Sequence, residues 1–448
     1  MIYRTLPPAP TGVATATAAG LHCPPPAAGG RLLLQGGLVV DPKNGVEEPR
    51  DLALLGGVVH SCQPHIPTEP GDTVIDCRGL YVFPGLIDMH LHLGDLFEVS
   101  TDPFAHAAAD GVTVAFSPGA GNTLLAPSLL GAEFDRGLPI SAGVYAGAPA
   151  LLATSLDDEE LVSYFTGTLV REVALQKLSR NPIGVATGMQ IIGVKDHMGH
   201  FILSDESAER IFSVTSRAGL LFMTHTQDPE HACRMAALSK GRPLYLGHAS
   251  AAGCGTFGDG AADMKQVLDL LAQPNIDGEL LASMMRQNRG CREGLRIDSR
   301  AQQLCYQALA EGRVQVLASD GQGDATMKGF GDSRDNIPAL FELCDLGVLP
   351  LSKAVALMTK NPAHILSART GNPWFEQQLG HLGCGAAANV TVADRHTGRA
   401  IYTIVNGQLA AFESRPLRSG WGAGRLVCRF GSLSRTGVGD CSMGTVLP

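Results

Sequence analysis

Three features common in other classes of protein are missing from this chain. No run approaches the ~18 consecutive apolar residues that a membrane helix needs, so we expect no membrane contact. The 34 lysine and arginine residues are outnumbered by 43 aspartate and glutamate residues, and no basic run stands out in a formal net charge of −9. A nucleic-acid partner is therefore not expected either.

The cysteines do not form the pattern of a disulfide framework. There are 11, scattered from Cys23 to Cys441, and no C-x-x-C pair is present. An odd number of scattered cysteines is typical of reduced thiols, which predicts a cytoplasmic protein. The first thirty residues have no basic segment followed by a compact apolar one, so residues 1–30 are interpreted as a flexible arm and not as a signal peptide.

The composition predicts one large core and a smaller unit. Hydrophobic residues make up 45% of the 448 and charged residues 17%. Short apolar runs broken by turn residues occur near both ends, for example at Leu52–Leu55 and Val390–Asp394. We therefore expect one small β-sandwich domain assembled from residues 31–83 and 370–448.

The middle of the chain, residues 84–369, alternates strand-like and helical runs. This alternation predicts βα units around a parallel sheet, that is, an α/β fold with a (β/α)₈ TIM barrel, and an open doubly wound sheet is the alternative. Helical stretches are expected at Asp158–Leu178, Glu206–Ala218 and Ser299–Ala310, and one strand between about Asn275 and Met285 has no clear pattern. The seven recognisable strand-like runs end at or near His90, Phe116, Val144, Lys195, His225, His248 and Asp320.

Polar side chains with ligand chemistry follow several of these runs. His90 and His92 are two residues apart on an extended chain, so both side chains point to one side and can hold one ion. Barrel active sites lie at the carboxyl ends of the strands, where further polar residues are expected to join this pair. These are Lys195, His225, His248 and Asp320.

The segment Pro84–His92, with the sequence Pro-Gly-Leu-Ile-Asp-Met-His-Leu-His, resembles the first-strand motif of the amidohydrolase superfamily. The similarity extends through Gly247–Ala249, Ala318–Gly321 and Thr359–Ala363 and covers most of the chain. The superfamily includes dihydroorotases, hydantoinases and D-aminoacylases. The resemblance implies a metal-dependent hydrolase of a C–N bond, other than a peptide bond, in a small-molecule amide or cyclic amide, and a homo-oligomer.

The resemblance also implies a centre of two divalent metal ions, with Zn²⁺ expected and Mn²⁺, Fe²⁺ or Co²⁺ compatible with the same ligands. A lysine ammonium cannot bind a cation, whereas a lysine carbamate formed with CO₂ can bridge two ions. A metal-bridged hydroxide would attack the carbonyl, and Asp320 would act as general base and then as general acid. Carried over by position, the buried metal takes His90, His92 and Asp320, the outer metal takes His225 and His248, and Lys195 is the carboxylated bridge.

Several residues have a second interpretation. Lys195 could be an ordinary lysine paired with Asp196, in which case His197 or His200 would replace it as a ligand or bind substrate. His225 and His248 could be hydrogen-bonded core histidines. The remaining histidines, such as His231, are expected to be structural or on the surface. Loop residues proposed to contact substrate are Asn122, Met198 and Phe201.

The type of C–N bond stays open at this point. Asp320-Gly321 departs from the Ser-Asp-His of hydantoinase-like members and resembles the Ser-Asp-Gly of D-amino-acid deacylases, so linear and cyclic amides are both considered. Deamination of a nucleobase-like heterocycle is the second hypothesis. Mononuclear deaminases typically carry Glu three residues after the fifth-strand histidine, and Asp228 occupies that position here. A catalytically inactive scaffold is the third.

Overall fold

A computed structural model describes most of the chain. The predicted arm lies outside the described residues except for Gly30, and so do His200 and the three predicted substrate contacts. Within the described part, no helix is both long enough and apolar enough to cross a membrane. The described ranges are 30–93, 103–118, 138–178, 187–197, 202–289, 295–321, 330–417 and 422–432.

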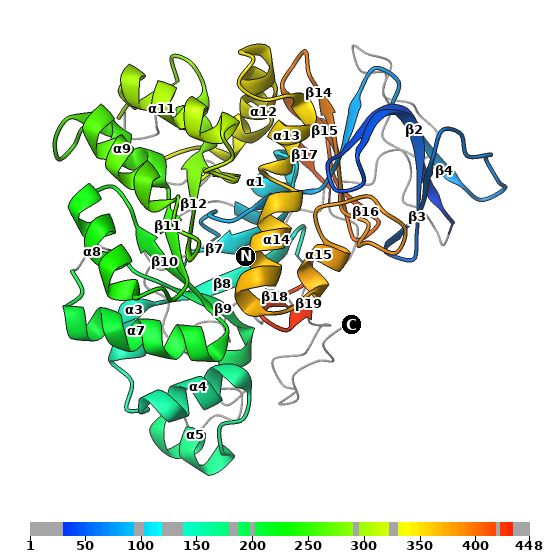
Figure 1. The fold of residues 1–448 in the computed structure, drawn as a ribbon. Coiled ribbons are helices and arrows are strands. Elements are labelled where there is room, and N and C mark those ends of the chain that lie inside the picture. The colour runs from blue at the N-terminus through cyan, green and yellow to red at the C-terminus, as the bar shows by residue number, and fades with distance from the viewer. Residues whose placement is uncertain are drawn as a thin grey trace.

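Eight parallel strands form a closed barrel (Figure 1). Neighbouring strands pair in sequence order from β6 to β13. The first and last strands meet through a parallel bridge between Leu91 and Gly321, and the Asp320 N–H donates to the His90 carbonyl at 2.7 Å. The predicted barrel is confirmed, and an open doubly wound sheet is excluded. The strands are β6 (Leu86–Asp88), β7 (Val112–Ser117), β8 (Ser141–Gly147), β9 (Ile191–Lys195), β10 (Leu221–His225), β11 (Leu244–Gly247), β12 (Ile276–Leu281) and β13 (Val316–Ala318).

Helices cover the outside of the barrel, and local capping sets their limits. The predicted helix over Asp158–Leu178 is two helices, because Gly167 ends the first in a left-handed conformation at φ +77°. The helices are α1 (Pro103–Ala109), α3 (Ala148–Leu152), α4 (Asp158–Thr166), α5 (Arg171–Lys177), α7 (Asp205–Ala218), α8 (Pro229–Ser239), α9 (Gly260–Leu270), α10 (Ala282–Met285), α11 (Ser299–Ala310), α12 (Asn336–Asp345), α13 (Leu351–Ala356), α14 (Lys360–Thr370) and α15 (Trp374–Gln378). Three short 3₁₀ helices accompany them within the described ranges, at Thr187–Gln190, Ala249–Cys254 and Ser333–Asp335.

The amino-terminal end of the barrel is closed by packed apolar side chains. Barrel-interior residues such as Val114 and Met223 share one cluster with Leu366 of α14, Phe375 of α15 and Val427. Val427 belongs to the hairpin of β18 (Val427–Cys428) and β19 (Gly431–Ser432). Because this end of the barrel is filled, a site is expected at the opposite end, where the carboxyl ends of the strands lie.

A separate nine-stranded sheet draws on both ends of the chain (Figure 1). β5 pairs antiparallel with β14, which joins the two ends, and β5 continues through Gly85 into barrel strand β6. A Cβ at Gly85 would lie 2.2 Å from the Thr113 hydroxyl, so this junction requires glycine. The division into 31–83 plus 370–448 and 84–369 stays a proposal. The strands are β1 (Leu32–Asp41), β2 (Val46–Leu55), β3 (Val58–Gln63), β4 (Thr73–Asp76), β5 (Tyr81–Pro84), β14 (Val390–Asp394), β15 (Arg399–Val405), β16 (Gln408–Phe412) and β17 (Arg415–Pro416).

Candidate metal centre

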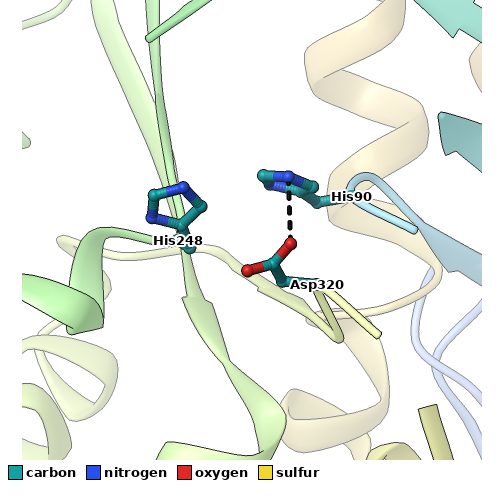
Figure 2. A group of neighbouring side chains, drawn as sticks. All are labelled: His90, His248 and Asp320. Atoms are coloured by element: carbon teal, nitrogen blue, oxygen red, sulfur yellow. Dashed lines mark ion pairs between the residues drawn. The ribbon is translucent and has the colours of Figure 1, made fainter. Parts of the chain in front are cut away.

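The six residues singled out from the sequence lie at or just beyond the carboxyl ends of five barrel strands. Three of them, His90 after β6, His248 after β11 and Asp320 after β13, come close enough to share one ion, with their potential ligand atoms within 4.8 Å of one another. Figure 2 shows the imidazole of His90 and the carboxylate of Asp320 facing each other beside His248. All three side chains are buried.

Asp320 joins both histidines of the first-strand pair. Its Oδ1 lies 3.2 Å from His90 Nε2 and 2.9 Å from His92 Nε2. Burial alone would raise the pKa of Asp320, but the two histidines outweigh it and hold the pKa below its ordinary value. Asp320 is therefore a carboxylate at neutral pH, the form that binds a cation.

The four site histidines form a continuous row of rings. Ring centroids are 5.5 Å apart for His92 and His90, 5.2 Å for His90 and His248, and 4.4 Å for His248 and His225. Burial lowers the pKa of His225 to about 3, assisted by Lys195, and lowers that of His248 well below its usual value. Both imidazoles are thus neutral at pH 7, as a metal ligand must be.

His248 does not have the environment of an ordinary core histidine. Its Nδ1 is buried and has no hydrogen-bond partner among the described residues. Its backbone is left-handed, at φ +42°, as is that of Asp320 at φ +46°. Such conformations are unfavourable for residues other than glycine and are concentrated at functional sites, so both observations favour a ligand over a structural histidine.

Lys195 is fully buried at the end of β9, and its Nζ has no hydrogen-bond partner within the described ranges. Asp196, the alternative partner considered from the sequence, instead accepts hydrogen bonds from the Thr224 hydroxyl at 2.5 Å and His231 Nε2 at 2.9 Å. His231 is therefore structural. Burial lowers the pKa of Lys195. An unpaired buried ammonium is costly, whereas the neutral amine is the form that reacts with CO₂, so Lys195 fits a carboxylated lysine.

His197, the other candidate ligand near Lys195, is also buried. Burial lowers its pKa well below the usual value, and the neighbouring Lys195 lowers it further. Its neutral imidazole is compatible with binding either a metal or a substrate.

Two residues that the sequence did not single out contact the cluster. Glu279 of β12 lies with Oε1 2.5 Å from His90 Nδ1. Phe330 packs its ring 5.0 Å from that of His248, and its N–H donates to Asp320 Oδ2 at 2.9 Å. The sequence offered no clear signal for either residue, because the run that contains Glu279 had no recognisable strand pattern and Phe330 follows no strand-like run.

The fold and the site together define a barrel enzyme with a metal-binding cluster at the carboxyl ends of its strands. The amidohydrolase family model matches residues 81–412, and the chain belongs to the amidohydrolase family. It is therefore a hydrolase of C–N bonds, as the first-strand motif predicted.

Named proteins match this chain over most of its length. A dihydroorotase of Geobacter sp. (strain M21) is 23% identical over 428 residues, which cover 84% of this chain and 98% of the relative. A crystal structure of D-hydantoinase matches with a TM-score of 0.65 at 17% identity, covering 88% of this chain and 98% of the other. The dihydropyrimidinase from Brevibacillus agri NCHU1002 gives 0.64 at 17% identity, with coverage of 88% and 97%.

Proposed function

We propose that this protein hydrolyses a cyclic amide at a two-metal centre. The observation that carries the metal site is the convergence of His90, His248 and Asp320, whose potential ligand atoms lie within 4.8 Å of one another. The second ion, and the division of the ligands between two ions, are proposed from the resemblance to the amidohydrolase superfamily. Substrate class comes from the relatives, since the dihydroorotase, hydantoinase and dihydropyrimidinase are all named for cyclic substrates. A linear amide is the nearest alternative, because Asp320 is followed by glycine.

The described side chains fit the proposed metals. His90, His92 and Asp320 would hold the buried ion, His225 and His248 the outer ion, and the Lys195 carbamate would lie between them. Imidazole and carboxylate ligands suit Zn²⁺, which we propose, as well as Mn²⁺, Fe²⁺ or Co²⁺. When bound, two such ions would acidify a water molecule and polarise the scissile carbonyl.

Asp320 is the proposed proton carrier. Its low pKa keeps it ionised at neutral pH, which is the form that can accept a proton from the attacking water, and the Phe330 N–H fixes the orientation of its carboxylate through Oδ2. The same carboxyl group would then deliver that proton to the leaving nitrogen when the ring opens. This assigns Asp320 two consecutive roles, base and acid.

The Lys195 carbamate would form without an enzyme partner. The neutral amine nitrogen attacks the carbon of CO₂, a C–N bond forms while one C=O π bond breaks and leaves its electron pair on oxygen, and the nitrogen loses one proton to solvent. The buried position of Lys195 supports this step, because burial lowers the pKa of the amine and so raises the fraction that is neutral.

Deamination is less well supported. Asp228, at the position of the acidic residue of mononuclear deaminases, begins helix α8, and its side chain accepts the N–H of Glu230 at 2.9 Å. A carboxylate engaged in capping a helix is less suited to shuttling protons. An inactive scaffold is disfavoured because all six proposed ligands are present.

Metal content and ring opening test the proposal together. Protein expressed with Zn²⁺ and bicarbonate should contain about two ions per chain, and Lys195→Ala clearly fewer. The wild type is then assayed on dihydroorotate, hydantoin, dihydrouracil and N-acyl-D-amino acids, and its mass in solution is measured for the expected homo-oligomer. Ring opening is the expected result. Cleavage of linear amides alone would indicate a deacylase, ammonia release a deaminase, and absence of metal the scaffold.

A further inference from the structure

Glu279 is a buried carboxylate that touches two of the proposed ligand residues. It lies on β12 with none of its surface exposed. Among the described residues its one ion-pair partner is His90, and no lysine or arginine pairs with it. A buried carboxylate without a cationic partner is costly unless its oxygens accept several hydrogen bonds, so what donates to them is informative.

Three donors from two other strands meet at this carboxylate. Oε1 lies 2.5 Å from His90 Nδ1 and 2.9 Å from the backbone nitrogen of His248. Oε2 accepts the Tyr245 hydroxyl at 2.9 Å. Both oxygens are therefore fixed. From its place on β12, the carboxylate contacts a residue just after the end of β6 and residues on and just after β11.

The contact with His90 determines which imidazole nitrogen is free. An ionised carboxylate only accepts hydrogen bonds, so Nδ1 of a neutral His90 must carry the proton. Nε2 is then left with its lone pair, and it is this atom that lies 3.2 Å from Asp320 Oδ1 (Figure 2). The arrangement is a carboxylate–histidine pair whose outer nitrogen points into the cluster, as in metal sites where a carboxylate orients the ligand.

The contact with His248 is made by its backbone N–H, which donates to Glu279 Oε1. His248 has a left-handed conformation at φ +42°, which is unfavourable for a residue with a side chain. Its N–H reaches Glu279 in that conformation, and its ring lies 5.2 Å from the His90 ring, centroid to centroid. One carboxylate thus supports a proposed ligand of the buried metal and a proposed ligand of the outer metal.

We infer that Glu279 is a positioning residue that fixes His90 and His248 as ligands of the two metals, with Tyr245 holding the carboxylate in place. This inference rests on the proposed two-metal centre. Glu279 itself takes no part in binding the substrate or in proton transfer. Its effect is on the affinity and geometry of the metal site, which can be measured without any substrate.

The test compares metal affinity in folded variants. Glu279→Gln keeps the size of the side chain and removes its charge, and Tyr245→Phe removes one donor without altering a ligand. Zn²⁺ affinity is measured by competition with a chelator, and the visible spectrum of Co²⁺-loaded protein reports the coordination geometry. We expect about 10- to 100-fold weaker Zn²⁺ binding and an altered spectrum for Glu279→Gln, and a smaller loss for Tyr245→Phe.

Asp51→Asn is the matched control. Asp51 is also buried and accepts two backbone N–H groups, from Gly36 and Ile66, but it lies in the terminal sheet. This variant should lose stability and keep the wild-type Zn²⁺ affinity. If wild type binds two ions and Glu279→Gln shows unchanged Zn²⁺ affinity and an unchanged Co²⁺ spectrum, the positioning role of Glu279 is refuted and the proposed function stands. A wild type that binds no metal would overturn the proposed function as well.

Discussion

Lys195→Met should make the metal-free protein more stable and the metal-loaded protein less stable than wild type. The Nζ of Lys195 is buried without a hydrogen-bond partner in the described structure. Burial of an unsatisfied polar group costs about 1–3 kcal/mol in protein mutational data, and an apolar side chain of similar length removes that cost. We therefore expect the chelator-treated variant to gain about 1–3 kcal/mol in free energy of unfolding.

Bound metal should reverse the order of stability, so that wild type becomes more stable than Lys195→Met. An ion that binds only the folded state stabilises it by about 2.7 kcal/mol at a concentration 100 times its Kd. Wild type would gain this stabilisation from both ions, whereas the variant lacks the bridging ligand and would gain less. Lys195→Met would then be the less stable protein in Zn²⁺ and bicarbonate.

The assay is urea unfolding of both proteins, with chelator and with Zn²⁺ plus bicarbonate. Lys265→Met is the control, because Lys265 is exposed and pairs with Asp269 one helical turn away, so its replacement should change stability by less than about 0.5 kcal/mol. A metal-free Lys195→Met less stable than wild type would refute the interpretation of Lys195 as an unsatisfied amine. Equal metal stabilisation of both proteins would refute the bridge.

Three further outcomes are expected. Asp320→Asn should lower kcat by about 10²- to 10⁴-fold, measured on the best ring substrate with metal content determined in parallel, because it removes the proton carrier and one proposed ligand of the buried metal. Removal of metal with a chelator should abolish activity, and Zn²⁺ with bicarbonate should restore it. Asp110→Asn should stabilise the protein above pH 7 by up to roughly 4 kcal/mol and have little effect near pH 4, measured by urea unfolding at both pH values. Burial raises the pKa of Asp110 to about 7, so the folded state holds a proton that the unfolded state releases, and this stability is lost as pH rises from about 4 to about 7.

The sequence predicted the barrel and most of its strands because their signals are local. The apolar runs before His225 and His248 each end in a polar residue, and the structure places strands β10 and β11 there. The helix predicted over Asp158–Leu178 was too long, since Gly167 favours the left-handed conformation that ends a helix. Local patterns therefore located the elements well and their ends less well.

Strand β12 had no clear pattern for a physical reason. Three of its six residues, Asp277, Gly278 and Glu279, are poor strand formers by composition. Glu279 is tolerated there because donors from β11 and from the end of β6 meet it in the folded barrel. Such partners are distant in sequence, so no local pattern could reveal that this glutamate is buried, or that it faces the site.

The hydrogen bonds of the site separate two kinds of residue. Glu279 and His231 have partners within the protein, so they can hold other groups in place. The buried Nζ of Lys195 and Nδ1 of His248 have none in the described structure. Such unsatisfied buried atoms destabilise the metal-free fold. Bound cations and a carbamate would satisfy both atoms at once, which is why we expect metal binding, and not packing, to decide the stability of this end of the barrel.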